Sequence, residues 1–574
     1  MPEMGSLALV PLVFGLSVFG PGYWLIRRTD WRPVEKATAA LVLSVLLVGL
    51  ASFAVGVLRL HPICRVLLLV ACAASTAASL PAVARLLRAE AGARRALVWF
   101  ALLAVWAVAL QALVRNYSGG NLVYDWLDHY QRSKFFLGGQ PTDTLFSGAL
   151  LPARPPLMNA FAAQIMALTL PRFPCYQLTA ALLAVLAYFP MLLIARLFSS
   201  TGSGVSRTLA IVLMFQPMFI QNVSYSWTRM PAAFFVLAAV GFYVAGWRVG
   251  DHRRMLFAFI CGAAAILTHY SSVPYVLFLA LHYLLHVLPR RDRAARELAA
   301  IVLAAGLVLA PWFAWATSVF GAGRVVSTAL VSSGKPLLTA GANLIKAALN
   351  LRDMFVPHLL REVPRDARSS GLTWGRIRDD AFTMYQGNLP LALGSLGAVL
   401  LVTEVVRSRR HPKAPRTDSL WFWAALAAFA VAAGIGVHGG REPLGLAQTA
   451  QQPLVMIGVA FLASRFEGWP RALRWLAAGG LLVDALLGVL LHFWLQSYPL
   501  ELPDGWSGPL GLTRDDLLFT MAEWNWGVKR GGRHLFVADL LGSRTWFPAI
   551  LVTALFVGAA VMLFRAAARR ERST

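Results

Sequence analysis

The sequence predicts an all-α polytopic membrane protein with about fifteen transmembrane helices, and three observations lead to this fold class. Hydrophobic residues make up 58% of the 574 residues, and the mean hydropathy is +0.62. Only 14% of the residues are charged, against about a quarter in an average soluble protein. Long apolar segments, each near the ~20 residues that a helix needs to cross a bilayer, recur along the whole chain. A lipid bilayer is therefore the first expected partner.

The apolar segments are expected to form these helices in order along the chain. They lie at about 4–26, 38–58, 67–84, 96–114, 175–195, 208–222, 230–246, 255–268, 272–288, 298–318, 388–404, 419–437, 447–463, 473–495 and 545–564. The first segment has no basic region before it and is too long for the apolar part of a signal peptide, so we interpret it as a retained helix. Because the number of segments is odd, the two termini are expected on opposite sides of the membrane.

Positive charge sets the expected orientation. The chain has 52 Lys and Arg against 27 Asp and Glu, a formal charge of +25. More than half of the basic residues lie in short segments that alternate with almost uncharged turns, and the positive-inside rule places these basic segments in the cytoplasm. The N-terminus is then outside and the C-terminus cytoplasmic, in a cell (inner) membrane. Because the surplus charge faces anionic lipid headgroups, no nucleic-acid partner is expected.

The same topology places three long segments outside the membrane, at about 115–174, 319–387 and 496–544. In the first, Asp125 to Leu137 is expected to form a short amphipathic helix, and Leu157 to Leu170 a second one that lies in the membrane interface. The cytoplasmic loops are short, and the chain has no P-loop, HExxH or GxSxG motif. These features disfavour an enzyme that uses ATP or a nucleotide sugar on the cytoplasmic side.

The run 125-DWLDHYQRSKFF-136 concentrates ionisable residues at a membrane boundary, where they are costly and commonly functional. Asp125 and Asp128 are separated by one helical turn and are the candidate catalytic carboxylates. Asp125 also stands where an N-cap is expected, which is the structural alternative for this residue. His129 and Tyr130 are candidate substrate-binding residues on the same helix.

Four further candidates for substrate binding lie in polar turns that the topology brings to the same side. Arg154 precedes Pro155-Pro156 at the start of the second amphipathic helix, where an arginine can bind a lipid phosphate or extend to the headgroups. Arg229 lies in the turn at 222–231. His269 and Tyr270 form the next outer turn, although a single histidine at a helix end commonly has only a structural role.

These motifs resemble the GT-C superfamily of lipid-phosphosugar-dependent glycosyltransferases. The most similar members are bacterial relatives of protein O-mannosyltransferase and of the lipid A aminoarabinose transferase (glycosyltransferase family 39-like). The resemblance depends on three motifs in a shared order: 125-DWLDHYQRSKFF-136, 154-RPPL-157 and 310-APW-312. It covers roughly residues 96–320. The implied architecture has N-terminal helices at 1–95, a catalytic transmembrane core at 96–320 and a C-terminal transmembrane region at 321–574.

The resemblance also implies the reaction and the roles of matching residues. Asp125 falls on the general base of the family, and Arg154 on the residue that contacts lipid phosphate. The implied reaction is inverting transfer of a hexose or pentose from a polyprenyl phosphate to a glycan, lipid or protein acceptor at the extracytoplasmic face. Some relatives bind a divalent metal ion through a Glu where this chain has Ala153. The sequence therefore identifies no certain cofactor and leaves a divalent metal ion open.

Two other functions remain compatible with the sequence. A transporter or flippase of a lipid-linked sugar would use the same charges along a translocation path, but transporters commonly have an internal repeat and charges near the bilayer midplane. An O-antigen ligase or polymerase would use Arg and His residues of the outer segments. A structural scaffold has no need of the polar outer turns.

Overall fold

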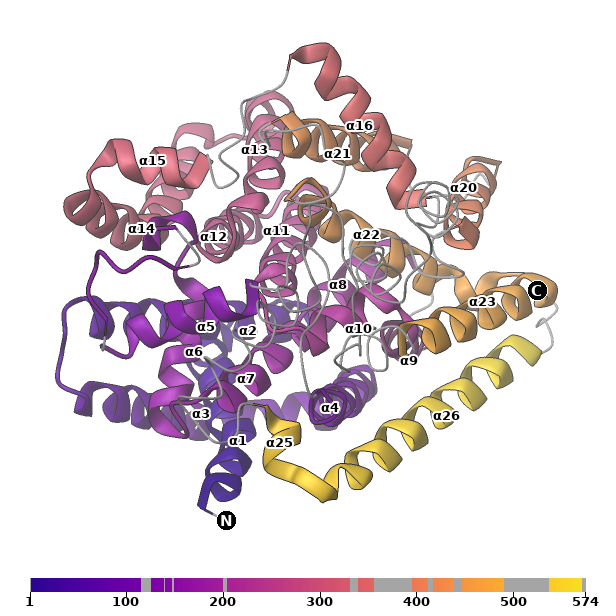
Figure 1. Cartoon of the computed structure of the whole chain (residues 1–574). Helices are drawn as coiled ribbons and strands as arrows, with labels where there is room; N and C mark the ends of the chain where they lie inside the picture. Colours follow the sequence, from indigo (N-terminus) through magenta and orange to yellow (C-terminus); the bar gives the residue numbers. More distant parts are fainter. Residues whose placement is uncertain are drawn as a thin grey trace, which may run out of the picture.

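The computed structural model is a bundle of α-helices (Figure 1). It describes residues 2–114, 125–138, 140–146, 149–199, 204–330, 339–355, 395–410, 417–436, 446–489 and 536–569. The helices up to the second outer segment are α1 (Pro2–Ile26), α2 (Pro33–Val57), α3 (Ile63–Ala89), α4 (Ala91–Gln111), α5 (Asp125–Phe136), α6 (Leu157–Leu168), α7 (Phe173–Val185), α8 (Tyr188–Phe198), α9 (Val205–Phe215), α10 (Pro217–Ser224), α11 (Arg229–Val249), α12 (His252–Thr268), α13 (Val273–His282) and α14 (Ala294–Phe320). They are followed by α15 (Ala322–Leu330), α16 (Ala340–Phe355), α20 (Ser395–Arg410), α21 (Thr417–Gly436), α22 (Leu446–Arg465), α23 (Arg471–Val489), α25 (Val537–Leu541) and α26 (Trp546–Ala568).

The predicted all-α, multi-pass membrane architecture is confirmed, but the count of fifteen spans is not. Within the described residues, ten helical segments are long and apolar enough to cross a membrane. The segment predicted at 208–222 is split at Gln216 into the short helices α9 and α10, and α12 has 17 residues. α20 has 16 residues, the apolar part of α21 is Leu420–Gly434, and α22 carries Gln451 and Gln452. An apolar segment therefore need not become a full span by itself.

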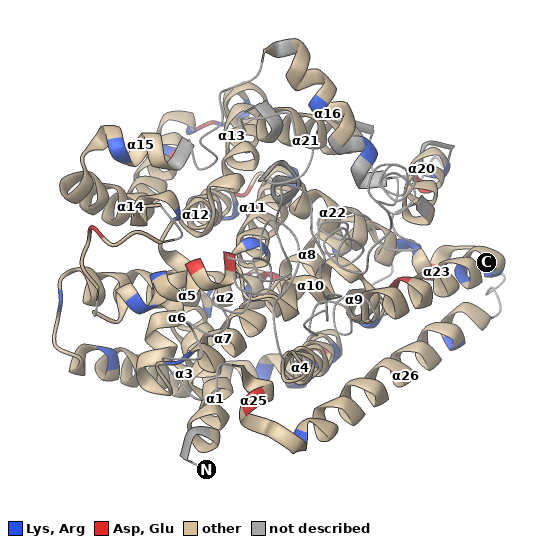
Figure 2. Cartoon of the chain, in the orientation of Figure 1, with Lys and Arg blue, Asp and Glu red and all other residues tan. Residues whose placement is uncertain are grey.

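The interior of the bundle is built from α7, α8 and α11. The window across α7 and α8 is fully buried, and that of α11 is nearly so. In Figure 1 these helices lie near the centre, whereas α26 runs along one edge. α3, α14 and α26 bury much less of their apolar surface, as expected of helices that face lipid. Charged residues are sparse over most of the ribbon (Figure 2).

The N-terminal helices pack directly on the rest of the bundle. α1 and α2 cross so closely that a Cβ on Gly22 would lie 2.0 Å from the carbonyl oxygen of Ala40, which requires glycine at this position. The backbone N–H of Gly22 donates to Ser44 Oγ at 2.8 Å. α2 in turn contacts α6 and α8. Ser52 of α2 donates to the carbonyl oxygen of Ala160 in α6 at 2.6 Å.

The second expected amphipathic helix exists, and other helices of the bundle cover it; its expected position at the membrane interface remains a prediction. α6 (Leu157–Leu168) is buried from Leu157 to Met166. Four alanines allow neighbouring helices to approach it, and the Phe161 ring packs edge-on against Phe14 of α1. A helix surrounded by protein is as apolar as one in lipid, so its composition alone does not distinguish the two positions.

Candidate active site

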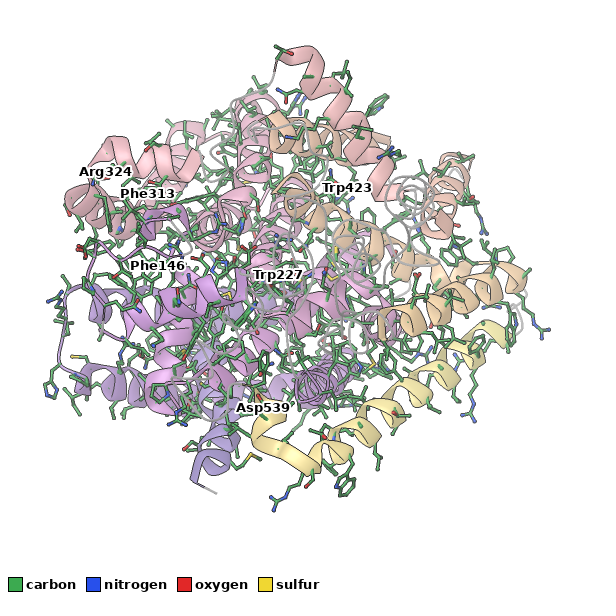
Figure 3. All side chains as sticks on the ribbon, viewed as in Figure 1. Phe146, Trp227, Phe313, Arg324, Trp423 and Asp539 are labelled. Carbon is green, nitrogen blue, oxygen red and sulfur yellow. The ribbon has the colours of Figure 1, made fainter. Side chains whose placement is uncertain are left out.

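Segments from six parts of the chain meet around the N-terminal half of α5. They are α5 itself, the 3₁₀ turn Leu151–Ala153 with Arg154, helix α6, the turn before α11, the turn between α12 and α13, and helix α14. The predicted outer turns are therefore brought together. Trp227, in the turn before α11, lies near the centre of the molecule (Figure 3).

Asp125 begins α5 and faces Arg229, the first residue of α11. Arg229 Nη2 is 3.5 Å from Asp125 Oδ2. The Asp125 side chain is 23% exposed, whereas the Arg229 side chain is only 3% exposed. The Arg229 guanidinium also lies 3.8 Å from the centre of the Trp227 ring, a cation–π geometry. Asp125 is therefore a carboxylate that is held in position yet remains accessible.

Trp227 is itself fixed in place. Its indole Nε1–H donates to Asn222 Oδ1 at 2.7 Å, and its ring packs against Tyr225 at 4.7 Å. The Asn222 amide donates to the carbonyl oxygen of Met218 within α10. The polar turn at 222–231 thus holds the Trp227 ring against the Arg229 guanidinium. The surrounding fold therefore determines the direction of that guanidinium.

Asp128 lies one turn further along α5 and forms a buried ion pair. Arg132 Nε donates to Asp128 Oδ2 at 2.9 Å, and both side chains are almost fully buried. Arg132 Nη1 also donates to the Leu151 carbonyl oxygen at 2.6 Å, and the guanidinium lies 4.9 Å from the Phe146 ring centre. Burial lowers the pKa of Arg132 from its usual value, and Asp128 opposes that shift. This geometry connects α5 to the segment before Arg154.

His129 projects from α5 into the same polar site. Its Nε2 is 3.3 Å from Thr228 Oγ1, and its Nδ1 is 3.5 Å from Asn159 Nδ2 of α6. Burial holds the pKa of His129 well below its usual range, and the cations Arg154, Arg132 and Arg229 lower it further. His129 is therefore neutral at pH 7 and acts as a hydrogen-bonding group rather than as a cation.

His269 and Tyr270 form the adjacent turn between α12 and α13. His269 Nδ1 accepts the backbone N–H of Ser271 at 3.1 Å, so the turn fixes its tautomer and leaves Nε2 as the N–H donor. Burial holds the pKa of His269 well below its usual range, and Arg154, Arg229 and His129 lower it further. The Tyr270 hydroxyl donates to the Pro152 carbonyl oxygen and accepts from Trp312 Nε1, both at 3.3 Å.

Arg154 follows the 3₁₀ turn Leu151–Ala153 and is half-buried. Within the part of the chain that the structure describes, its guanidinium makes one hydrogen bond, at 3.4 Å to the neighbouring carbonyl oxygen of Ala153. Its charge acts on both His129 and His269. Arg154 is thus a cation beside the site, and the described residues engage its guanidinium through that one hydrogen bond.

Tyr130 is directed to the other side of α5, away from His129. Its ring lies 5.3 Å from Phe173 and 5.8 Å from Tyr176, and burial raises its pKa to about 12. Trp126 belongs to the same aromatic cluster, at 4.8 Å from Phe173. Both rings pack against protein, and a role of Tyr130 in substrate binding remains a prediction.

The side chains near Asp125 bear on whether the described part of the site fits a divalent metal ion. Among the described residues no group of three or more His, Cys, Asp and Glu side chains has the arrangement of a metal site. Of the acidic residues at this site, Asp128 is committed to Arg132 and Asp125 to Arg229. These side chains do not fit a divalent ion, and no step below requires one.

Several residues of the site were not found from the sequence. Arg132, Asn159, Thr228 and Trp312 all contact predicted site residues. Asn159 was the most accessible signal, because an amide inside the apolar helix 157–168 is costly unless it is hydrogen-bonded. Trp312 was visible only as part of the APW motif.

Comparison with solved structures finds ArnT from Cupriavidus metallidurans. Its apo crystal structure has a TM-score of 0.46 and 14% sequence identity, and the match covers 83% of this chain and 78% of ArnT. Its crystal structure bound to undecaprenyl phosphate has a TM-score of 0.45 and 14% identity, with 82% and 77% covered. No protein-family model and no curated protein sequence match the chain.

Proposed function

We propose that this protein is an integral membrane glycosyltransferase that transfers a sugar from a polyprenyl-phosphate donor to an acceptor at the extracytoplasmic face. The observation that supports this proposal most is the combination at one site of the accessible carboxylate of Asp125 with the cations Arg154 and Arg229. The transfer requires both parts: a base for the incoming nucleophile and positive charge for the departing phosphate.

Asp125 is the general base in this proposal. Its exposed carboxylate oxygen accepts the proton of the acceptor hydroxyl or amine as that group attacks the anomeric carbon of the sugar. The ion pair with Arg229 fixes the direction of the carboxylate. A positioned base of this kind contributes about 10²–10⁴-fold to the rate.

Arg154 and Arg229 stabilise the leaving group. As the bond between the anomeric carbon and the phosphate oxygen breaks, its electron pair passes to the polyprenyl phosphate, which gains negative charge. The Arg154 guanidinium presents a planar set of donors that matches phosphate geometry. Attack by the acceptor from the face opposite the phosphate is a single displacement, so the configuration at the anomeric carbon is inverted.

The two histidines are neutral hydrogen-bonding groups in this mechanism. Burial and the nearby arginines keep the pKa of His129 and of His269 low. Neutral imidazoles bind sugar hydroxyls without competing with Arg154 for the phosphate. Tyr270 bridges the carbonyl oxygen of Pro152 and Trp312 beside the segment that carries Arg154, which supports a positioning role for Tyr270.

Reconstitution tests the proposal against a transport function. The full chain in vesicles is supplied with a polyprenyl-phosphate sugar, and release of the free carrier and the anomeric configuration of the product are followed. The proposal predicts carrier release with inversion. Movement of intact lipid-linked sugar across the bilayer without carrier release contradicts it and favours a flippase.

A further inference from the structure

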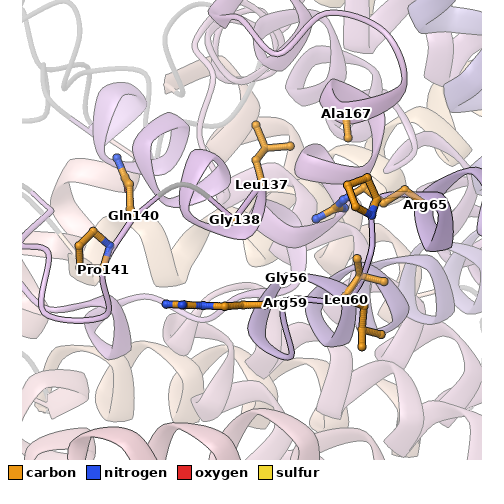
Figure 4. Close-up of a pocket in the computed structure, with 11 residues that line it drawn as sticks. Gly56, Arg59, Leu60, Arg65, Leu137, Gly138, Gln140, Pro141 and Ala167 are labelled. Atoms are coloured by element: carbon orange, nitrogen blue, oxygen red, sulfur yellow. The ribbon is translucent and has the colours of Figure 1, made fainter.

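A second site lies at the opposite end of α5 from Asp125. A pocket of about 530 Å³ opens between the turn joining α2 to α3 and the C-terminal end of α5. Figure 4 shows the Arg59 side chain along one edge of the pocket and the Arg65 guanidinium at the other end. Gly56, Leu60, Leu137 and Ala167 complete its walls. None of the residues assigned to the transfer reaction lines this pocket.

Arg65 is a buried cation with only neutral partners. It is 6% exposed, and its Nη1 donates to Ser52 Oγ at 2.8 Å and to Gln164 Oε1 at 3.3 Å. Its Nη2 donates to the Phe136 carbonyl oxygen. No ion pair within the described part of the chain includes Arg65. A guanidinium has five N–H donors, so two remain for an anion, and a buried charge of this kind calls for an opposite charge.

Arg59 brings a second positive charge to the same pocket. Its backbone has φ of +50°, in the left-handed region that residues other than glycine rarely adopt. Such a conformation is unfavourable for a residue other than glycine and is concentrated at ligand-binding segments. It turns the chain between α2 and α3, so that the exposed Arg59 side chain lies beside the pocket rather than in a helix.

The surface next to the pocket fits a lipid. From Ile63 onward, α3 presents the exposed apolar side chains Ile63, Val66, Leu67 and Val70, between 44% and 59% exposed. Their spacing places them on one helix face, and they begin directly beside Arg65. Because α2 ends and α3 begins at this turn, the pocket lies at the level of lipid headgroups.

We propose that this pocket binds the phosphate headgroup of a membrane lipid, with the hydrocarbon chain along the apolar face of α3. Arg65 and Arg59 bind the phosphate, and Leu60 and Leu137 cover the adjoining glycerol or first methylenes. The site is independent of the transfer reaction, so it stands or fails separately from the proposed function.

The test measures binding of dioleoyl phosphatidic acid to the purified full chain by native mass spectrometry in neutral detergent. Arg59→Gly removes one guanidinium and keeps the turn, since glycine adopts a positive φ without penalty. Ala167→Phe fills the pocket without changing its charge, because Ala167 is an exposed lining residue. Arg28→Gln, at an exposed position between α1 and α2, is the matched control for loss of one positive charge.

We expect saturable binding of one phosphatidic acid, with affinity lowered about tenfold by Arg59→Gly, as expected for one charge-assisted hydrogen bond. Ala167→Phe should lower it at least as much, and Arg28→Gln should leave it unchanged. Equal binding by the wild type, Arg59→Gly and Ala167→Phe overturns the site. Equal competition by dioleoylglycerol overturns the role of the phosphate, and equal competition by inorganic phosphate overturns the lipid.

Discussion

The two ends of helix α5 lie in environments that differ in the balance of positive and negative charge. At its N-terminal end every buried cation has a carboxylate: Arg229 pairs with Asp125, and Arg132 pairs with Asp128. At its C-terminal end Arg65 contacts Ser52, Gln164 and a backbone carbonyl, with no carboxylate in the described part of the chain. The first arrangement positions charges against one another, whereas the second leaves a charge that an external anion can balance. The two ends should therefore respond differently to mutation.

The largest effect on stability is expected from Asp128→Asn. The change leaves the Arg132 guanidinium buried without its counter-charge, which costs about 3–5 kcal/mol. SDS-titrated unfolding of the purified protein in mixed micelles measures this loss. Asp143→Asn, at an exposed position of the same outer segment, should change the free energy of unfolding by less than about 0.5 kcal/mol. Equal stability of the two variants would contradict the inference that Asp128 balances the buried charge of Arg132.

Arg229→Gln should lower the rate of carrier release about a hundredfold, comparable with removal of one group that stabilises a transition-state charge. It removes the cation that holds Asp125 and faces the proposed leaving group. Arg324→Gln, at an exposed position on α15, is the control and should retain the wild-type rate. A normal rate in Arg229→Gln would remove this residue from the mechanism.

Ser52→Ala examines the C-terminal end of α5 and should cost about 1–2 kcal/mol. Ser52 Oγ accepts from Arg65 and donates to the Ala160 carbonyl oxygen, so these two hydrogen bonds are lost while the other bonds of Arg65 remain. The same SDS titration measures the change. A loss of unfolding free energy as large as that of Asp128→Asn would contradict the proposed difference between the two ends of α5.

The smallest effect near neutral pH concerns His129 and His269. Because their pKa values in the folded protein are lowered, the unfolded chain binds more protons once the pH falls below about 6.5. Stability is therefore full above that pH and decreases as the pH is lowered to 5.5. His129→Asn should flatten this dependence of the melting temperature. His252→Asn, at an exposed position, should not, and an identical slope in both variants would refute the explanation.

The sequence predicted the local helices well because they depend on local signals. The helix expected from Asp125 to Leu137 runs from Asp125 to Phe136, and the one expected from Leu157 to Leu170 ends at Leu168. The meeting of the outer turns also followed, since alternating spans bring alternate loops to one side. The division between the domains at 1–95, 96–320 and 321–574 remains a prediction.

The features that the sequence did not predict depend on tertiary contacts. Arg132 was unassigned because two of its three acceptors, the carbonyl oxygens of Leu150 and Leu151, lie far along the chain. Tyr130 is predicted to bind substrate, and the sequence did not show that its ring also packs against Phe173 and Tyr176 of α7. The burial of α6 was missed because lipid and protein interiors are both apolar. Most of the third predicted outer segment, at about 496–544, lies outside the described residues, which resume at residue 536.

The most direct test of the proposed mechanism compares Asp125→Asn with Asp143→Asn in single-turnover release of carrier from a labelled polyprenyl-phosphate sugar. Asparagine keeps the size of the side chain and cannot accept the proton. The mechanism predicts that Asp125→Asn loses about a hundredfold or more of the release rate, while Asp143→Asn matches the wild type. Carrier release by Asp125→Asn at the wild-type rate would contradict the assignment of the base.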